Sequence, residues 1–124
     1  MVSIDIHSDS RYKVNREMVR EYVSAQWKER ELPEGKLDIA FVGSRKARSL
    51  SKQYLKDDSP HPVLTFPFVS RFPHETDVVG EVIICFPQVV LYAADQDKEI
   101  DKVIRQFLDH AITIFSNEFR TINK

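Results

Sequence analysis

The sequence VVGEVIICF, at residues 78–86, decides the fold that we expect, because it is the most apolar of the predicted strands. A short run that is apolar on both faces is typical of a strand near the centre of a sheet. The preceding run VLTFPF, at residues 63–68, is rich in β-branched and aromatic residues and also predicts a strand. Pro62 and Pro67 lack a backbone N–H donor, which favours an edge position for this second strand.

Two further strands are expected upstream of this pair. Val2, Ile4 and Ile6 alternate with polar residues, which is the pattern of a half-buried strand. The run LDIAFV, at residues 37–42, follows a break and predicts the next strand.

Apolar residues at helical spacing predict helices in the segments between and after the strands. Asn15 is a suitable cap for a first helix and Ser44 for a second. The face of the second helix that repeats at helical spacing consists of Ala47, Leu50, Ser51, Tyr54 and Leu55. Pro87 opens a third helix, and the last one runs from about Asp97 to Phe119 with a wide apolar stripe. The predicted order is therefore β-α-β-α-β-β-α-α, with the last helix as the main core helix.

The composition is that of an ordinary globular chain of 124 residues, and we expect a single domain over residues 1–124. The 18 basic residues almost balance the 19 acidic ones, giving a net charge of −1. Any contact with RNA must therefore come from a local basic patch, because the chain has no strong positive excess.

The expected compartment is the cytoplasm. Cys85 is the one cysteine, so no intramolecular disulfide can form, and a reducing setting is the simplest one. The first nine residues lack the basic and apolar segments of a signal peptide, and no apolar run is long enough for a membrane helix.

Three segments carry a family resemblance. They are ARSLSKQYLKDDSPHPVLTFPF at residues 47–68, GEVIIC at residues 80–85, and HAITIFSNEFR at residues 110–120. In order and spacing they resemble the YbeY-family patterns LNxxYR followed by PTDVLSFP, then GDIxIC, then HGxLHLxGYDH. The resemblance implies an α+β fold in which a small mixed sheet of about four strands packs against helices. It also implies a zinc ion held by three histidines, and single-strand-specific endoribonuclease activity in the maturation of ribosomal RNA.

The chain departs from these patterns where the chemistry would lie. His110 matches the first zinc ligand, whereas Ile114 and Arg120 stand at the other two ligand positions. Leu55 replaces the arginine of the YR pair, and Pro62 replaces the aspartate of PTDV. These replacements predict lost or weak hydrolytic activity, with His110 as a remnant ligand and no cofactor, or zinc only if the site survives in altered form.

An altered metal site is the alternative that we keep open. His61 precedes the edge strand and is a speculative second ligand beside His110, with Glu81 or Asp109 as a carboxylate. Against this alternative, no ligand pair has the helical or turn spacing of a known motif.

The basic patch is expected on the second helix. Arg45, Arg48 and Lys52 share one helical face and are candidates for contact with RNA phosphates. Arg71 lies in an aromatic, basic loop that is suited to unpaired bases. The alternative interpretations are a solvated helix face and a loop that packs on the edge of the core.

The sequence therefore predicts a YbeY-like protein of ribosomal RNA maturation or ribosome biogenesis, which binds ribosomal RNA or a ribosome-associated protein. One alternative is a metal-dependent endoribonuclease with rearranged ligands. The other is a protein-interaction module that uses the exposed edge strand around Val63 to Phe68.

Overall fold

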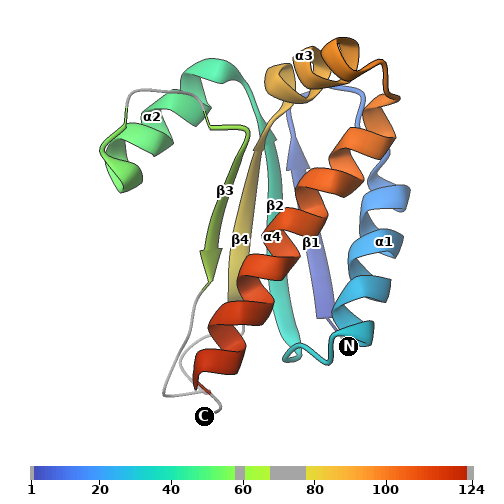
Figure 1. Ribbon diagram of the computed structural model, residues 1–124, viewed down its shortest axis with the longest axis vertical. Helices are drawn as coiled ribbons and strands as arrows, with labels where there is room; N and C mark the ends of the chain where they lie inside the picture. The colour runs from blue at the N-terminus through green and yellow to red at the C-terminus, as the bar shows by residue number, and fades with distance from the viewer. Residues whose placement is uncertain (1, 58–60, 68–77, 123–124) are drawn as a thin grey trace.

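A computed structural model describes residues 2–57, 61–67 and 78–122. The order of elements is the one predicted (Figure 1), with the bounds β1 Val2–Ser8, α1 Arg16–Glu29, β2 Gly35–Val42, α2 Ser44–Leu55, β3 Val63–Pro67, β4 Val78–Cys85, α3 Phe86–Gln96 and α4 Ile100–Ile122. Among these residues, no helix is both long enough and apolar enough to span a bilayer.

The four strands form one mixed sheet in the order β1-β2-β4-β3. β1 pairs with β2 and β2 with β4 in parallel, whereas β3 pairs with β4 in antiparallel fashion. β4 is thus an interior strand and β3 an edge strand, which confirms both predictions and the α+β fold class.

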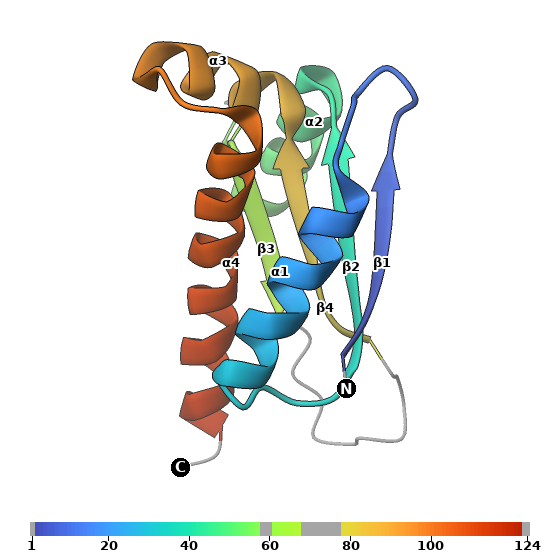
Figure 2. The ribbon, with the colours of Figure 1, turned by 90° about the vertical axis from the view of Figure 1, so that its right-hand side faces the viewer.

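The hydrophobic core lies on one face of the sheet, which helices α1 and α4 cover (Figure 2). Val82 and Ile84 of β4 face the same core as Leu37 and Ile39 of β2. The long helix α4 buries a broad stripe in this core, as predicted: Val103, Ile104, Leu108, Ala111, Ile112 and Phe115.

Gly80 sets how closely α4 approaches β4. A Cβ atom at this position would collide with the ring of Phe115 and would also lie 3.1 Å from the carbonyl oxygen of Phe66. The missing side chain therefore allows the Phe115 ring, which is fully buried, to rest directly on the strand.

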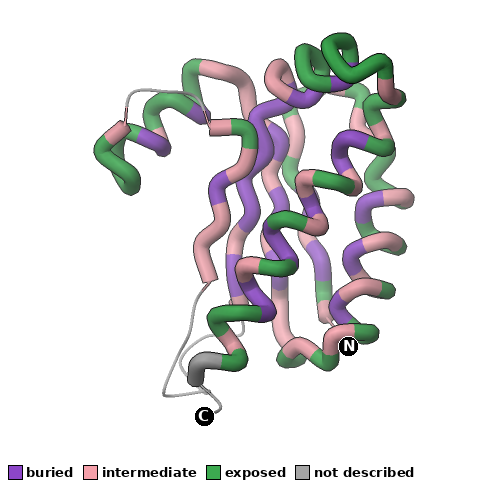
Figure 3. Tube along the Cα trace, viewed as in Figure 1, coloured by how far each residue is buried: buried purple, intermediate pink, exposed green. Residues whose placement is uncertain are grey.

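The opposite face is covered differently, because α2 lies behind the sheet near one end only (Figure 2). Figure 3 shows that buried residues alternate with less buried ones along the strands, as expected for a sheet with one fully covered face. Ser3, Asp5 and His7 of β1 are exposed or half-buried, in contrast to the buried Ile4 and Ile6 between them.

The local details of the helices agree only in part with the predictions. Asn15 caps α1, and its side-chain oxygen accepts a hydrogen bond of 3.1 Å from Met18 N. Ser44 does not cap α2, because Gly43 is the N-cap residue and Ser44 is the first residue of the helix. Tyr54 and Leu55 were expected on the apolar face of α2, but their side chains are 56% and 51% exposed.

Candidate functional site

Helix α4 carries the residues that correspond to the zinc ligands implied by the resemblance. His110 and Arg120 are exposed, and Ile114 is half-buried. Neither an isoleucine nor a guanidinium side chain is a zinc ligand in proteins. The residues at these positions therefore do not fit a zinc ion held by three imidazoles.

His61, the speculative second ligand, lies beside a carboxylate close in sequence. Its Nε2 atom is 2.9 Å from Asp57 Oδ2, and the two side chains are 36% and 46% exposed. Of the carboxylates considered as partners, Asp109 accepts a hydrogen bond of 2.6 Å from the Tyr22 hydroxyl. Asp109 thus serves the contact between α1 and α4, and burial together with this bond raises the pKa of Tyr22 to about 12.

The basic residues of α2 meet a cavity beyond the carboxyl ends of β1 and β2. The cavity has a volume of about 640 Å³, and its lining includes Arg11, Arg45 and Lys46. Arg45 and Lys46 lie in the first turn of α2, which contains no acidic residue. Cations are unfavourable at the positive end of a helix dipole, so this turn has an excess of positive charge that its own sequence does not offset.

Within the described part of the chain, Arg45 and Lys46 have no carboxylate partner. Arg11, by contrast, pairs with Asp9 at 3.0 Å. Arg48 and Lys52, the other predicted cations of this helix, are exposed but do not line the cavity. The structure therefore brings Arg45 and its neighbour Lys46 together with Arg11, a cation that the sequence analysis did not single out.

A smaller cavity of about 260 Å³ lies between α2 and the outer face of the sheet. Lys46 lines it together with Tyr54, Phe66 and Glu81. The rings of Tyr54 and Phe66 are 5.0 Å apart, and Tyr54 is 56% exposed. An exposed aromatic ring and a cation shared between two cavities form a surface suited to a base and its phosphate.

Two of the residues singled out from the sequence do not line these cavities. Leu55 and Pro62, which replace polar residues of the family patterns, are both exposed. Arg71 lies outside the described residues, so its predicted contact with RNA stays a prediction.

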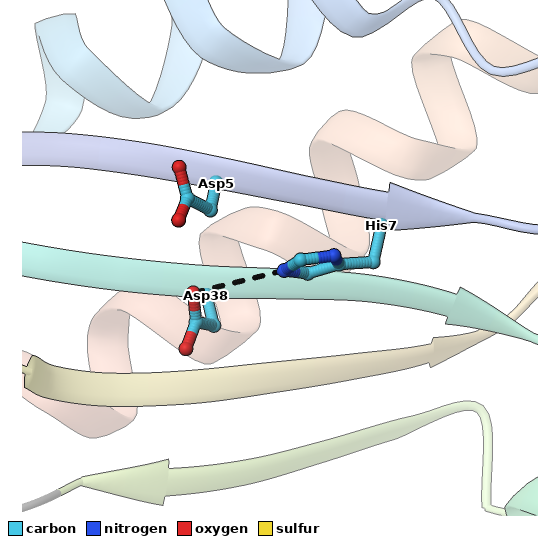
Figure 4. Close-up of side chains that lie close together, drawn as sticks. All are labelled: Asp5, His7 and Asp38. Atoms are coloured by element: carbon cyan, nitrogen blue, oxygen red, sulfur yellow. Dashed lines mark ion pairs between the residues drawn. The ribbon is translucent and has the colours of Figure 1, made fainter.

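A cluster that the sequence analysis missed lies on the outer face, where β1 and β2 are adjacent (Figure 4). Asp5 and His7 project from β1 and Asp38 from β2, with one potential ligand atom of each within 4.8 Å of the others. Within the described part of the chain this is the one group of three such residues, and it includes neither His61 nor His110. The alternation Ile4-Asp5-Ile6-His7 could have indicated the pair on β1, but only the strand register adds Asp38.

The fold and these surfaces define a class: an α+β protein with a mixed sheet, an apolar helical face and a basic cavity at the carboxyl ends of its parallel strands. The solution structure of TM1509 from Thermotoga maritima has the same fold, with a TM-score of 0.61 at 20% identity. The similarity covers 91% of this chain and 71% of that one.

Sequence comparison identifies the family. The family model described as endoribonuclease YbeY matches residues 3–113, and the chain therefore belongs to the YbeY family. The match includes His110 but ends one residue before Ile114.

The curated relatives are longer than this chain. The endoribonuclease YbeY of Cellvibrio japonicus is 27% identical over 88% of this chain and 62% of its own length. That of Alteromonas mediterranea is 28% identical over 81% of this chain and 59% of its own length. The chain thus spans about three fifths of the length of these two relatives.

Proposed function

We propose that this chain is an RNA-binding member of the YbeY family that acts in the maturation of ribosomal RNA, in the cytoplasm, with lost or weak hydrolytic activity. The observation that carries the proposal is the pair Arg45 and Lys46, which lines the 640 Å³ cavity without carboxylate partners among the described residues. Family membership supports the choice of RNA as the anion, because the matching relatives are named endoribonucleases.

The charges of α2 favour a phosphate chain as the ligand. Arg45 and Lys46 line the cavity, and Arg48 and Lys52 extend the positive charge along the exposed side of the helix. Each phosphate that such cations neutralise releases counterions, so binding should weaken as the salt concentration rises.

The aromatic ring beside these cations favours single-stranded RNA over a duplex. Tyr54 is more than half exposed and lies against Phe66, so one side of the pair is accessible to an unpaired base. Stacking of a base on an aromatic side chain contributes roughly 1–3 kcal/mol.

The side chains on α4 support the absence of zinc-dependent hydrolysis. His110 has Ile114 and Arg120 at the positions where the family motif has its other imidazoles. A zinc-activated water needs several protein ligands and an open position on the metal, which this set does not supply.

Fluorescence anisotropy with a labelled single-stranded RNA oligonucleotide tests the proposal. We expect the double variant Arg45→Glu/Lys46→Glu to bind more weakly than the unmodified chain. The slope of log K against log salt concentration should become shallower by about 0.7 for each phosphate that the variant no longer neutralises. Lys102→Glu on α4 is the control for the change in charge and should bind as the unmodified chain does. Equal affinities for the double variant and the control, with both folded by circular dichroism, would contradict the proposal.

A loss of stacking separates the base contact from the phosphate contact. Tyr54→Leu should reduce the affinity at every salt concentration without changing the salt slope, because no charge is removed. A matched binding curve with double-stranded RNA should show no effect of this variant.

The endoribonuclease alternative rests on His110, the one imidazole that the family motif and this chain share. It predicts cleavage of the labelled RNA in the presence of Zn²⁺, and loss of that cleavage in His110→Ala. Cleavage that requires both Zn²⁺ and His110 would contradict the proposal of lost hydrolytic activity. The binding measurements would still test the contact between RNA and α2.

A further inference from the structure

The outer face of β1 and β2 carries a concentration of potential ligands far from the basic residues of α2 in sequence. The parallel register places Asp5 directly opposite Asp38, so two carboxylates face each other across adjacent strands. Like charges in this arrangement destabilise a sheet unless a cation lies between them. His7, two residues along β1, presents its imidazole to the same pair (Figure 4).

Lys36 neutralises only part of this negative charge. Its Nζ atom is 2.9 Å from Asp5 Oδ2, and this hydrogen bond holds the pKa of Asp5 below its usual value. The group thus holds two carboxylate side chains and the single ammonium group of Lys36.

One oxygen of the Asp38 carboxylate has no hydrogen-bond donor among the described residues. This oxygen, Oδ1, is buried. The nearest cationic candidate, His7 Nε2, is 3.8 Å away, which is too long for a hydrogen bond. A buried carboxylate oxygen without a donor is costly, and a metal ion would remove that cost.

We propose that Asp5, His7 and Asp38 form a binding site for a divalent transition-metal ion of the Zn²⁺ class, which bridges β1 and β2. One imidazole nitrogen with two carboxylate oxygens is a ligand set that suits Zn²⁺ better than Mg²⁺ or Ca²⁺, which prefer oxygen ligands alone. The site differs in residues and location from the helical zinc motif of the family, and it does not depend on the proposed RNA binding.

The present separations require only a small adjustment. Ligands at about 2.0–2.2 Å from zinc lie roughly 3.3–3.6 Å apart in a tetrahedral site. The ligand atoms here lie within 4.8 Å of one another. His7 is 66% exposed, so a rotation of its side chain brings the imidazole inward without moving the core.

Isothermal titration with Zn²⁺, using the chain without a histidine tag, tests the site. We expect one ion per chain, and a loss of affinity in His7→Gln and Asp38→Asn larger than the roughly 10–100-fold effects of residues that only orient ligands. Mg²⁺ should give little or no heat under the same conditions.

Lys36→Met gives the sharper result, because Lys36 competes with the metal for Asp5. Removal of this ammonium should increase the affinity for Zn²⁺, whereas a site elsewhere on the chain would not respond. The matched controls are His61→Gln and His110→Gln, which remove imidazoles outside the cluster and should leave the affinity unchanged.

Three outcomes would overturn the proposal. They are an absence of Zn²⁺ binding to both the unmodified chain and Lys36→Met, binding that survives His7→Gln, and binding that disappears in His61→Gln or His110→Gln. Nuclear magnetic resonance with Co²⁺ gives an independent readout, because the paramagnetic ion should shift the amide signals of residues 5–7 and 36–40 first.

Discussion

The two faces of the sheet differ in how their side chains are used. On the face that α1 and α4 cover, β2 and β4 contribute buried apolar side chains, among them Leu37, Ile39 and Ile84. On the outer face, the intervening residues of the same strands include Asp38 and Glu81, and α2 covers part of this face. The main core cluster thus lies on one face and the polar side chains of the candidate sites on the other, although both are built from the same strands.

The largest expected effect is the removal of a core ring on the covered face. Phe115→Ala should reduce the free energy of unfolding by about 3–5 kcal/mol, because it leaves a cavity under α4. Phe66→Ala, on the half-buried outer face, should cost clearly less. Chemical denaturation of both variants gives the comparison, and equal losses would mean that the faces do not differ in the way described.

Overpacking of the covered face should have the next largest effect. Gly80→Ala places a methyl group against the ring of Phe115, and a tightly packed core loses about 1–3 kcal/mol when it must shift. In Gly43→Ala the new methyl group meets the Tyr12 hydroxyl oxygen at 2.8 Å, which is the free end of a side chain that can move. Thermal unfolding should therefore show a smaller loss for Gly43→Ala than for Gly80→Ala.

A smaller loss of stability is expected from a change at the contact between α1 and α4. Tyr22→Phe removes the hydrogen bond to Asp109 and should cost about 1 kcal/mol. Burial and this bond raise the pKa of Tyr22 to about 12 in the folded state. The contribution of Tyr22 to the free energy of unfolding is therefore complete below pH 10. The contribution is lost as the pH rises from 10 toward 12, since the unfolded tyrosine ionises first.

A phenolate absorbance titration checks this prediction directly. One tyrosine should ionise later than the others, and the delayed transition should be missing in Tyr22→Phe. A delayed transition that persists in Tyr22→Phe would contradict the assignment.

The smallest effect is expected for Lys36→Met, which removes an exposed ion pair of the outer face and leaves Asp5 opposite Asp38 without this ammonium group. In chemical denaturation without added metal, it should lower the free energy of unfolding by less than Tyr22→Phe does.

The sequence predicted the covered face better than the outer one. The apolar stripe of α4 and the central position of β4 follow from periodicity, which reports burial directly. Periodicity does not show where a helix lies over a sheet, so it gave Tyr54 and Leu55 of α2 a buried position that they do not have. It also could not show that Gly43, rather than Ser44, ends the loop before α2.

The residues of the candidate sites were harder to predict because they depend on strand pairing. Asp5 and Asp38 are 33 positions apart in the sequence and meet only through the register of β1 and β2. Arg45 was identified from its charge, but its association with Arg11 depends on the loop after β1 lying beside α2. Spacing within one helix reveals neither contact.

The placement of the core on a single face has a consequence for how this architecture changes over generations. The polar residues of the outer face, such as Asp5, His7 and Asp38, and the exposed positions of α4 such as His110 lie outside the core cluster, so their replacement leaves the packing under α1 and α4 intact. A scaffold of this kind tolerates the loss of one reactive group and the gain of another without first becoming unstable. A sheet with two such different faces can therefore keep its fold while the reactive side chains of one face change.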